Sequence, residues 1–573
     1  MSVQTFPAPA TGVADSTAGS GGRNLRFEPV TRVSGGLALH ASADFTDSRT
    51  VRDAAVVATT FRGYEVILSG RDARDAVFVS SRACGVCGNA HATCAALAVE
   101  MACGVEPPPM AIAARNLLAA AECLIDHPSH LFLRAGPDYS EPVVRATSPE
   151  LWTRAEATPA AGAAVHGLAR VSDIMTELTR NSGALYREAL HLSRVAREAY
   201  VLIGGKYPHP QTITPGGVSS TVDTMDFNLA LLRAVSFLDY SRRVVAVWDD
   251  ITDFFHQADA RYAELGAGPR NFIDLGLWDN PRTYDASFGN VSSWGKERWS
   301  TPGAIVDGVL QTTDLRQIDA GVEEFVDHSF YEGWSGAAHS HDVDGNPLSQ
   351  HHPANKQTLP RPGDTNFDGS YSWSTAARWR GHPMETGAQA RMWATALAPD
   401  QPHGGFVEST GRSVRLNVPP AQMPASVLEW QVPERWNAFE RNRARAYALA
   451  QATLAAYENV VVGLDLARKG GANARIFTPY KIPKDAVLAS GYWGGARGYV
   501  SHHMQIDGRV IENYQIVGPS TFAGSPRDAA GNPGPCEAAV MATPLVTSDQ
   551  SQHGIDVLRT IRSFDLCMFC ATQ

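Results

Sequence analysis

Apolar residues recur at steps of three or four positions along several long stretches of the chain, as they do on one face of an α-helix. In residues 221–257, Leu229, Leu232, Val235 and Leu238 follow this spacing. Because such a stretch greatly exceeds the average helix of about 11–12 residues, we expect long helices that pack as a bundle. The same pattern predicts three further helices, over residues 110–134, 165–204 and 434–468.

Two other parts of the chain have the patterns of strands and loops. Residues 26–60 contain short β-branched runs broken by Ser34-Gly35-Gly36, which predicts a small antiparallel sheet. Residues 264–420 are rich in Gly, Trp, Pro and His, so we expect loops and short strands there. The predicted fold class is therefore α+β and mainly helical, with a core bundle of long helices and small antiparallel sheet elements.

The first 23 residues are rich in Pro, Ala, Gly, Ser and Thr and lack apolar periodicity. Such a segment cannot bury enough apolar surface to offset the entropy lost on ordering, so we interpret 1–23 as a flexible arm. We expect residues 24–573 to form one large domain, although a chain of 573 residues would usually contain about four.

Composition and charge narrow the class of protein. With 44% hydrophobic and 19% charged residues, the chain is typical of a globular protein. Its 49 basic and 59 acidic residues give a formal charge of −10, which argues against a nucleic acid as the main partner. No apolar run is long enough to predict a membrane span, and the N-terminus lacks the basic and apolar regions of a secretory signal.

Eight cysteines are too few for a disulfide framework, but four of them form two Cys-x-x-Cys pairs. Cys84 and Cys87 make the first pair, and Cys567 and Cys570 make the second, near the end of the chain. This spacing lets two thiolates converge on one metal, so both pairs together predict a buried four-sulfur site. Such a site would join the N- and C-terminal segments, which favours one interlocked domain over several.

Four thiolates suit zinc, an iron–sulfur cluster or nickel. From the spacing alone, a structural zinc site is favoured, and a thioredoxin-like redox pair is disfavoured because no βαβ pattern surrounds either pair. The other four cysteines show no cluster-binding spacing, and we expect them to pack in the core: Cys94, Cys103, Cys123 and Cys536.

The residues around the two pairs are more specific than their spacing. RACGVCGNAH (82–91) and SFDLCMFC (563–570) resemble the two signature motifs of the large, catalytic subunit of nickel–iron hydrogenases. FRGYEVILSGRDARDA (61–76) resembles that family's Arg-Gly-x-Glu segment. Further similar segments follow in the family's order, at 206–217, 327–334, 371–392, 514–521 and 534–544. The resemblance covers nearly the whole chain apart from the N-terminal arm.

The resemblance implies that all four of these cysteines bind nickel, and that Cys87 and Cys570 also bridge to an iron carrying carbon monoxide and cyanide. It implies an enzyme that cleaves dihydrogen heterolytically and works mainly in H2 uptake. Dihydrogen is apolar and a very weak acid, so its cleavage needs a metal to accept hydride and a nearby base to accept the proton. By analogy with the family, Cys567 is the first proton acceptor.

The resemblance also assigns roles to five other residues. Glu65 would carry the proton outward, since a partly buried carboxylate with a raised pKa can relay protons near neutral pH. Arg497 would lie over the metals, and Asp126 would orient it by ion pairing. His91 would donate a hydrogen bond to the bridging sulfur, and Ser520 would donate one to a cyanide. Taken alone, these residues have ordinary alternatives, such as a surface carboxylate, a satisfied core histidine or a turn-stabilising hydroxyl.

Oxidation of dihydrogen releases two electrons, and the chain has no evident carrier for them. An iron–sulfur small subunit is therefore the expected partner, and such heterodimers could assemble further. We expect a cytoplasmic protein, with any membrane association made through its partners.

Three positions depart from the family's pattern. Ile-Glu-Gly-His becomes Val33-Ser34-Gly35-Gly36, and the usual histidine after the last cysteine is Gln573. The missing Glu and His normally help to hold magnesium, and Ser34 and Gln573 do not replace their charge or imidazole, so the sequence does not support a magnesium site. Glu-Ala-Pro-Arg-Gly becomes Gly494-Gly495-Ala496-Arg497-Gly498, which keeps the arginine but gains glycine freedom. These departures indicate an outlying branch, such as the actinobacterial-type uptake hydrogenases.

Two alternative functions stay open. A dihydrogen sensor would have the same site but would signal to a partner, and a structural zinc protein would use the four cysteines to hold the fold together. A cluster-less relative in quinone-reducing complexes is disfavoured, because it would not need both intact pairs. A histidine-rich tract is also present, and a solvated loop is favoured there over a metal site: His339, His341, His351 and His352, with Asp342 and Asp344.

Overall fold

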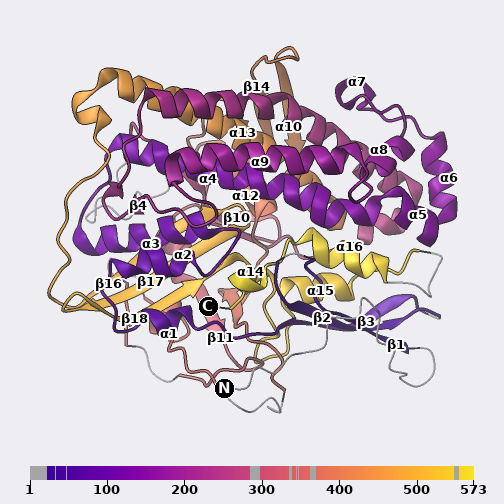
Figure 1. The fold of residues 1–573 in the computed structure, drawn as a ribbon. Coiled ribbons are helices and arrows are strands. Elements are labelled where there is room, and N and C mark those ends of the chain that lie inside the picture. Colours follow the sequence, from indigo (N-terminus) through magenta and orange to yellow (C-terminus); the bar gives the residue numbers. More distant parts are fainter. Residues whose placement is uncertain are drawn as a thin grey trace, which may run out of the picture.

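The computed structural model describes residues 22–32, 34–46, 48–283, 297–334, 338–342, 345, 347–361, 369–547 and 554–572. Except for its last two residues, the predicted N-terminal arm lies outside this part of the chain. Within it, the predicted fold class is confirmed, because long helices form a bundle and small antiparallel sheets lie beside it (Figure 1).

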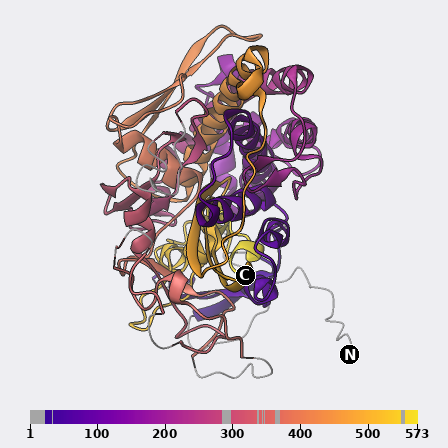
Figure 2. The ribbon, with the colours of Figure 1, turned by 90° about the vertical axis from the view of Figure 1, so that its left-hand side faces the viewer.

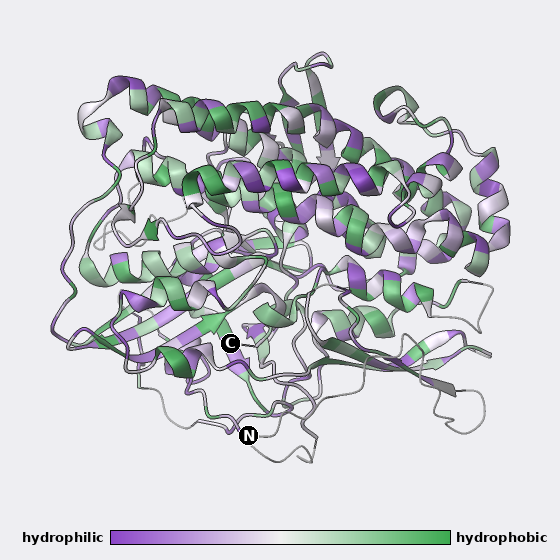
Figure 3. Ribbon diagram, in the orientation of Figure 1, coloured by the Kyte–Doolittle hydropathy of each residue, from purple (hydrophilic) through white to green (hydrophobic). Residues whose placement is uncertain are grey.

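Four long helices form the bundle in the upper part of Figure 1: α4 (Pro109–Pro128), α9 (Ala184–Gly204), α10 (Thr224–Ala258) and α13 (Ala438–Lys469). Helices α10 and α13 pack against each other, and α4 packs against both α13 and α9. The two longest begin at polar caps, since Asp223 and Asn437 each accept hydrogen bonds from backbone N–H groups of the next turn. Figure 3 shows hydrophobic and hydrophilic positions alternating around these helices, as in amphipathic bundle helices.

The helix predicted over 165–204 is wrong in its first half. The chain there forms two short helices before α9, α7 (Ala163–His166) and α8 (Val171–Glu177). Asn181 has a left-handed φ of 67°, and a Cβ on Gly183 would lie 2.1 Å from the carbonyl oxygen of Glu177. These residues make a tight turn that the apolar spacing does not encode.

Two three-stranded antiparallel sheets lie below the bundle in Figure 1. The first contains the predicted N-terminal strands, β1 (Gly22–Phe27), β2 (Leu37–Asp44) and β3 (Thr50–Ala58). The second consists of β16 (Val487–Gly495), β17 (Gly498–Asp507) and β18 (Val510–Val517). Helix α3 (Gly88–Cys103) packs on β16 and β17, and α15 (Pro535–Met541) packs on β3.

Segments from the two ends of the chain share one hydrophobic cluster. Leu37 and Val56 of the first sheet belong to the same cluster as Val557 and Ile561 of α16 (Ile555–Ser563). Thr572, the last described residue, is buried, and Figure 2 shows the C-terminus beside N-terminal segments. The joining of the two ends, which the cysteine positions predict, is thus confirmed.

The remaining elements are short. Those outside residues 264–420 are α1 (Tyr64–Leu68), α2 (Asp75–Ser81), η1 (Ser129–Ala135), η2 (Gly136–Tyr139), α5 (Glu141–Thr147), α6 (Pro149–Ala157), β4 (Ile213–Thr214), β5 (Gly217–Val218), η3 (Ala260–Glu264), β15 (Ser426–Gln431), η6 (Gly471–Ala474), α14 (Pro519–Ala523) and η7 (Met568–Cys570). Among the described residues, no helix combines the length and apolar character needed to cross a bilayer.

The short strands expected within residues 264–420 are also present. They are β6 (Phe272–Asp274), β7 (Leu277–Asp279), β8 (Arg298–Ser300), β9 (Gly303–Val306), β10 (Val309–Thr312), β11 (Val322–Phe325), β12 (Ala376–Trp379), β13 (Val407–Ser409) and β14 (Ser413–Val418), with α11 (Leu315–Ala320), η5 (Pro353–Asn355) and α12 (Ala388–Leu397) between them.

Candidate metal centre

Two loops bring the four cysteines of the Cys-x-x-Cys pairs together. Cys84 and Cys87 lie between α2 and α3, and Cys567 and Cys570 follow α16 around η7. The Sγ atoms of Cys84 and Cys567 are 3.8 Å apart, and those of Cys87 and Cys570 are 2.9 Å apart. All four side chains are fully buried.

This cysteine cluster has the donors that a soft metal needs. The sulfur atoms of Cys84, Cys567 and Cys570 all lie within 4.8 Å of one another. Every cysteine is free, and a separation of 2.9 Å is far longer than the roughly 2.05 Å of a disulfide bond. Convergent buried sulfurs without a disulfide fit a thiolate-bound metal, and nickel is among the metals that such ligands suit.

Arg497 lies at a tight turn beside the cluster. Strands β16 and β17 pair up to Gly495 and Gly498, so that Arg497 is one of the two residues that connect them. Its guanidinium donates to both carboxylate oxygens of Asp126, at 3.1 and 3.2 Å, and to Oγ of Ser34 at 3.3 Å. Although burial opposes its charge, Asp126 holds the pKa of Arg497 well above its usual value. The structure therefore brings Asp126 and Arg497 together, as the sequence predicts.

Asp565 completes the surroundings of Arg497, and sequence reasoning missed it. Its carboxylate oxygens lie 3.0 Å from Nε of Arg134, 2.8 Å from a terminal nitrogen of Arg445 and 3.3 Å from one of Arg497. Burial opposes the charged form, but the arginines hold the pKa of Asp565 well below its usual value. Asp126 and Asp565 therefore lie among three arginines, and these five side chains carry a net positive charge. That charge stabilises the ionised, thiolate form of nearby cysteines. The signal was available, because Asp565 lies within the SFDLCMFC motif.

Glu65 is buried in the first turn of α1. Its hydrogen bonds are made with Lys356, Ile516 and Thr358. Oε1 accepts from Nζ of Lys356 at 3.2 Å and from the backbone N–H of Ile516 at 2.9 Å, and Oε2 accepts from the hydroxyl of Thr358. Lys356 also bonds Oε1 of Glu324 at 3.2 Å. Burial raises the pKa of Glu65, against the opposing charge of Lys356. No motif or residue spacing points to Lys356 or Glu324.

The cluster containing Glu65 reaches the surface. Glu65, Thr358 and Gln515 line a pocket of about 470 Å³ whose wall also includes the exposed Glu512. The carboxylate is therefore buried but lies next to solvent-accessible space.

His91 and Ser520 also lie beside the cysteines. A ring nitrogen of His91 and the sulfurs of Cys87 and Cys570 lie within 4.8 Å of one another. Burial lowers the pKa of His91 to about 4. Ser520, in α14, accepts a hydrogen bond from the backbone N–H of Cys567 at 2.9 Å, which leaves its own hydroxyl hydrogen able to donate elsewhere.

The two positions that argue against magnesium are only partly described. Ser34 is buried, its carbonyl accepts from the N–H of Met568 at 3.0 Å, and its hydroxyl faces Arg497. Val33 and Gln573 lie outside the described residues. The doubt about magnesium therefore stays a prediction.

The solvated-loop prediction is wrong for His352, which is buried. Its Nε2 lies 3.4 Å from Oδ2 of Asp319, and Nε2 of His503 lies 3.4 Å from Oδ1 of the same carboxylate. These three groups are close enough to share a metal ion. However, Nδ1 of His352 accepts from the backbone N–H of Ala354, so Nε2 carries the hydrogen in the neutral ring and has no lone pair for a metal. Asp344 of the same tract lies outside the described residues.

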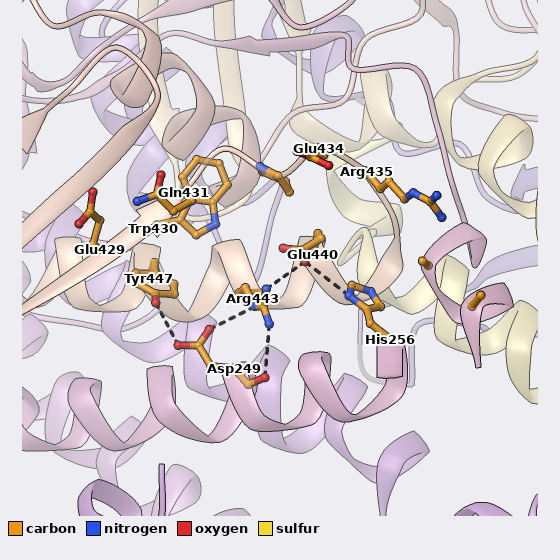
Figure 4. Close-up of a pocket in the computed structure, with 13 residues that line it drawn as sticks. Asp249, His256, Glu429, Trp430, Gln431, Glu434, Arg435, Glu440, Arg443 and Tyr447 are labelled. Atoms are coloured by element: carbon orange, nitrogen blue, oxygen red, sulfur yellow. Dashed lines mark hydrogen bonds and ion pairs between the residues drawn. The ribbon is translucent and has the colours of Figure 1, made fainter. Parts of the chain in front are cut away.

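A separate surface pocket of about 480 Å³ lies between α10, α13 and β15 (Figure 4). Arg443 is central to it, with ion pairs to Asp249, Asp253 and Glu440. Burial raises the pKa of Asp249 to about 6 and that of Glu440 to about 7. None of the site residues predicted from the sequence lines this pocket.

Comparison with known proteins tests the resemblance. The family model for nickel-dependent hydrogenases matches residues 62–178 and 177–573. An actinobacterial-type NiFe-hydrogenase from Ralstonia eutropha H16 is 37% identical, with a TM-score of 0.92 over 96% of this chain and 100% of that one. The uptake hydrogenase large subunit of Bradyrhizobium diazoefficiens is 28% identical, over 96% of this chain and 95% of the relative.

A more distant structure shows the fold alone. The Ni-Fe-Se hydrogenase of Desulfomicrobium baculatum is 24% identical, with a TM-score of 0.71 over 96% of this chain. The family model and the two relatives named above, which match over 96% of this chain, confirm the family resemblance found in the sequence. This chain belongs to the nickel-dependent hydrogenase family.

Proposed function

We propose that this protein is the catalytic large subunit of a nickel–iron hydrogenase that works mainly in the oxidation of dihydrogen to protons and electrons. The observation that carries the proposal is the convergence of four buried cysteine sulfurs beside a buried arginine. The relative from Bradyrhizobium diazoefficiens is named as an uptake hydrogenase large subunit and matches over nearly its full length, which supports the direction of the reaction.

Cys84, Cys87, Cys567 and Cys570 would hold the nickel, and Cys87 and Cys570 would also bridge to an iron with carbon monoxide and cyanide ligands. When bound, this centre would supply the heterolytic cleavage of dihydrogen, so that each molecule of H2 yields two protons and two electrons. The chain's own residues would hold and move the proton, place a positive charge beside the centre and keep water away from it.

Cys567 would hold the first proton on its sulfur. Its backbone N–H is fixed by Ser520, and its sulfur faces that of Cys84 at 3.8 Å. Arg497 is held by Asp126 and Asp565. It would place a fixed positive charge beside the bound centre and donate a hydrogen bond to it from the guanidinium. The hydroxyl hydrogen of Ser520 would donate to a cyanide, since its oxygen already accepts from Cys567.

Glu65 would carry the proton from the centre toward the surface. Burial raises the pKa of Glu65, which makes it easier for this carboxylate to take up a proton before passing it on. Lys356 holds one oxygen of Glu65 in place, and Thr358 bonds the other. The adjoining pocket would give the proton a route to solvent through Gln515 and Glu512.

The electrons would pass to an iron–sulfur small subunit. The other four cysteines do not supply a cluster site, because none of them groups with other possible ligands within the described residues. Cys94, Cys123 and Cys536 are buried as expected, but Cys103 is only partly buried, so the prediction that it packs in the core is not fully met. Exposed apolar side chains on α1 and α2, close in sequence to the first cysteine pair, would form part of the docking face: Val66, Ile67 and Phe78. Any membrane association or higher assembly of the protein would be made through this partner.

One experiment tests the proposal directly. Infrared spectra of the purified protein should contain one carbonyl and two cyanide stretching bands, and elemental analysis of the same sample should show stoichiometric nickel. Stoichiometric zinc without these bands would overturn the hydrogenase assignment and leave a structural zinc site.

A further inference from the structure

Three buried polar side chains form a chain that leads away from the cysteine cluster. Nδ1 of His91 lies 3.0 Å from Nε2 of His502, and Nδ1 of His502 lies 2.7 Å from the hydroxyl oxygen of Tyr514. His91 is in the first turn of α3, while His502 and Tyr514 lie on the neighbouring strands β17 and β18. The three side chains are at most 1% exposed, so water does not compete for these bonds.

The hydrogen atoms of this chain can be assigned by counting donors and acceptors. A neutral imidazole has one N–H and one lone pair, and burial lowers the pKa of His502 well below its usual value, so this ring is neutral. Burial also raises the pKa of Tyr514, so the phenol keeps its hydrogen. If Tyr514 donates to Nδ1 of His502, then Nε2–H of His502 donates to Nδ1 of His91.

The remaining nitrogen of His91 fixes the direction of the chain. When Nδ1 of His91 accepts from His502, its Nε2 must carry the hydrogen. Nε2 has no hydrogen-bond partner among the described residues, although it is fully buried. A ring nitrogen of His91 lies within 4.8 Å of the sulfurs of Cys87 and Cys570, and Nε2 is the nitrogen that His502 leaves without a partner. In the reverse direction Nε2 would carry a bare lone pair, which a nearby anionic sulfur repels, whereas an N–H facing a thiolate makes a charge-assisted hydrogen bond.

We propose that His502 and Tyr514 are positioning residues that lock the tautomer of His91, so that its Nε2–H points at the sulfurs of Cys87 and Cys570. This inference rests on the proposed function, because the sulfurs must be metal-bound thiolates for the bond to matter. The bond withdraws electron density from the bridging sulfurs and hence from the iron.

The test uses the infrared carbonyl band of the purified protein as its readout. His502→Leu removes the donor to His91, so the sulfurs become more electron-rich and the carbonyl band should move to lower wavenumber. Tyr514→Phe removes a single oxygen atom and frees both tautomers of His502, so a second band should appear on the low-wavenumber side. His502→Gln keeps an amide N–H that can donate to His91, so its band should stay near that of the unmodified protein.

Tyr492→Phe is the matched control. Tyr492 is also a buried tyrosine of this sheet, but its hydroxyl bonds Asp319 and not the histidine chain, so the carbonyl band should not move. Nickel content measured on every variant separates lost metal from an altered hydrogen bond.

The outcomes separate this inference from the proposed function. Bands that are absent from the unmodified protein would overturn the proposed function. Bands that are present but unmoved in both His502→Leu and Tyr514→Phe would overturn the tautomer lock alone. If His502→Leu loses its metal, the comparison of Tyr514→Phe with His502→Gln still decides, because only Tyr514→Phe should show a second carbonyl band at lower wavenumber.

Discussion

Arg497 shows how much of the centre depends on geometry as well as charge. Its planar guanidinium meets Asp126, Asp565 and Ser34 from one position, which an ammonium on a flexible stem cannot do. Arg497→Lys should therefore keep the buried positive charge but lose part of this hydrogen bonding. We expect dihydrogen oxidation to fall by roughly 10- to 100-fold, the equivalent of one buried charge-assisted hydrogen bond.

Dye-linked assays with nickel content measured on the same samples would check this prediction. Arg435→Lys is the control, because Arg435 is an exposed arginine paired with Glu264 and should tolerate the exchange. Unchanged activity in Arg497→Lys would show that charge alone is sufficient at this position.

Glu65 is the residue at which the proposed proton route can be interrupted. Glu65→Gln keeps the shape and an acceptor for Lys356 but cannot take up a proton. Turnover should fall by roughly 100-fold or more, as is usual when a positioned proton carrier is removed, while nickel content and infrared bands stay unchanged. Glu324→Gln is the matched control, since Glu324 bonds the same lysine on its other side and should slow turnover less. Full activity in Glu65→Gln would direct attention to another carrier.

Glu440, a buried residue away from the cysteine cluster, should make the stability of the protein depend on pH. Burial raises the pKa of Glu440 to about 7 from an ordinary 4.5, so between these pH values the folded chain binds more protons than the unfolded chain. The free energy of unfolding therefore falls as pH rises through this window. Glu440→Gln cannot ionise and avoids this loss, so relative to the unmodified protein it should gain roughly 2–3 kcal/mol between pH 5 and pH 8.

Denaturant unfolding at both pH values would measure this gain. Glu434→Gln, an exposed position in the same pocket, should show none. A difference between Glu440→Gln and the unmodified protein that does not change with pH would contradict a raised pKa at Glu440.

At the scale of elements, the packing of α3 on β16 supports the first cysteine pair. A Cβ on Gly491 would lie 1.9 Å from the carbonyl oxygen of Cys94, and neither backbone can yield without moving a whole element. Gly491→Ala should therefore separate α3 from the sheet and destabilise the protein by at least about 1–3 kcal/mol. Because α3 begins directly after Cys87, nickel content should fall as well.

Thermal unfolding and elemental analysis of Gly491→Ala would test this close contact. Gly333→Ala is the control, since a Cβ at Gly333 meets nothing within 4 Å. A stable, nickel-replete Gly491→Ala protein would show that α3 and β16 can move apart without affecting the cysteines.

The elements also show where sequence patterns succeed. Helices α10 and α13 could be predicted because long apolar periodicity and clear ends coincide in the sequence. The turn at Asn181 and Gly183 could not, because it arises from backbone conformation and a close carbonyl contact. His352 was misplaced for a similar reason, since its burial depends on Asp319, which is distant in sequence and carries no pattern.

The residues of the candidate metal centre likewise fall into those that the sequence could predict and those that it could not. Motifs located the four cysteines and Arg497, while only the family resemblance pointed to Asp126, and the structure pairs Asp126 with Arg497. Asp565 lay inside a recognised motif but was overlooked because the cysteines beside it dominated the pattern. Lys356, Glu324, His502 and Tyr514 could not be found, because their contacts form only when distant loops and strands pack.

At the scale of the whole molecule, metal binding should stabilise the junction of the two chain ends. A metal held by both pairs favours the folded state, and its removal leaves only packing and hydrogen bonds to hold η7 in place. Hydrogen–deuterium exchange should therefore rise in residues 82–91 and 563–572 of the metal-free protein, while α10 should exchange at an unchanged rate. Equal protection with and without metal would show that the junction is preformed.

The separation of the two cysteine pairs also has a consequence for synthesis. A ribosome that adds about 5–20 residues per second needs roughly 25–100 seconds to advance the 483 positions from Cys84 to Cys567. Throughout that interval the first pair has no partner, and its thiols are open to oxidation or to capture by a competing metal. All four cysteines can hold the metal only after Cys570 has been added, so oxygen and free zinc present during translation should lower the yield of active protein.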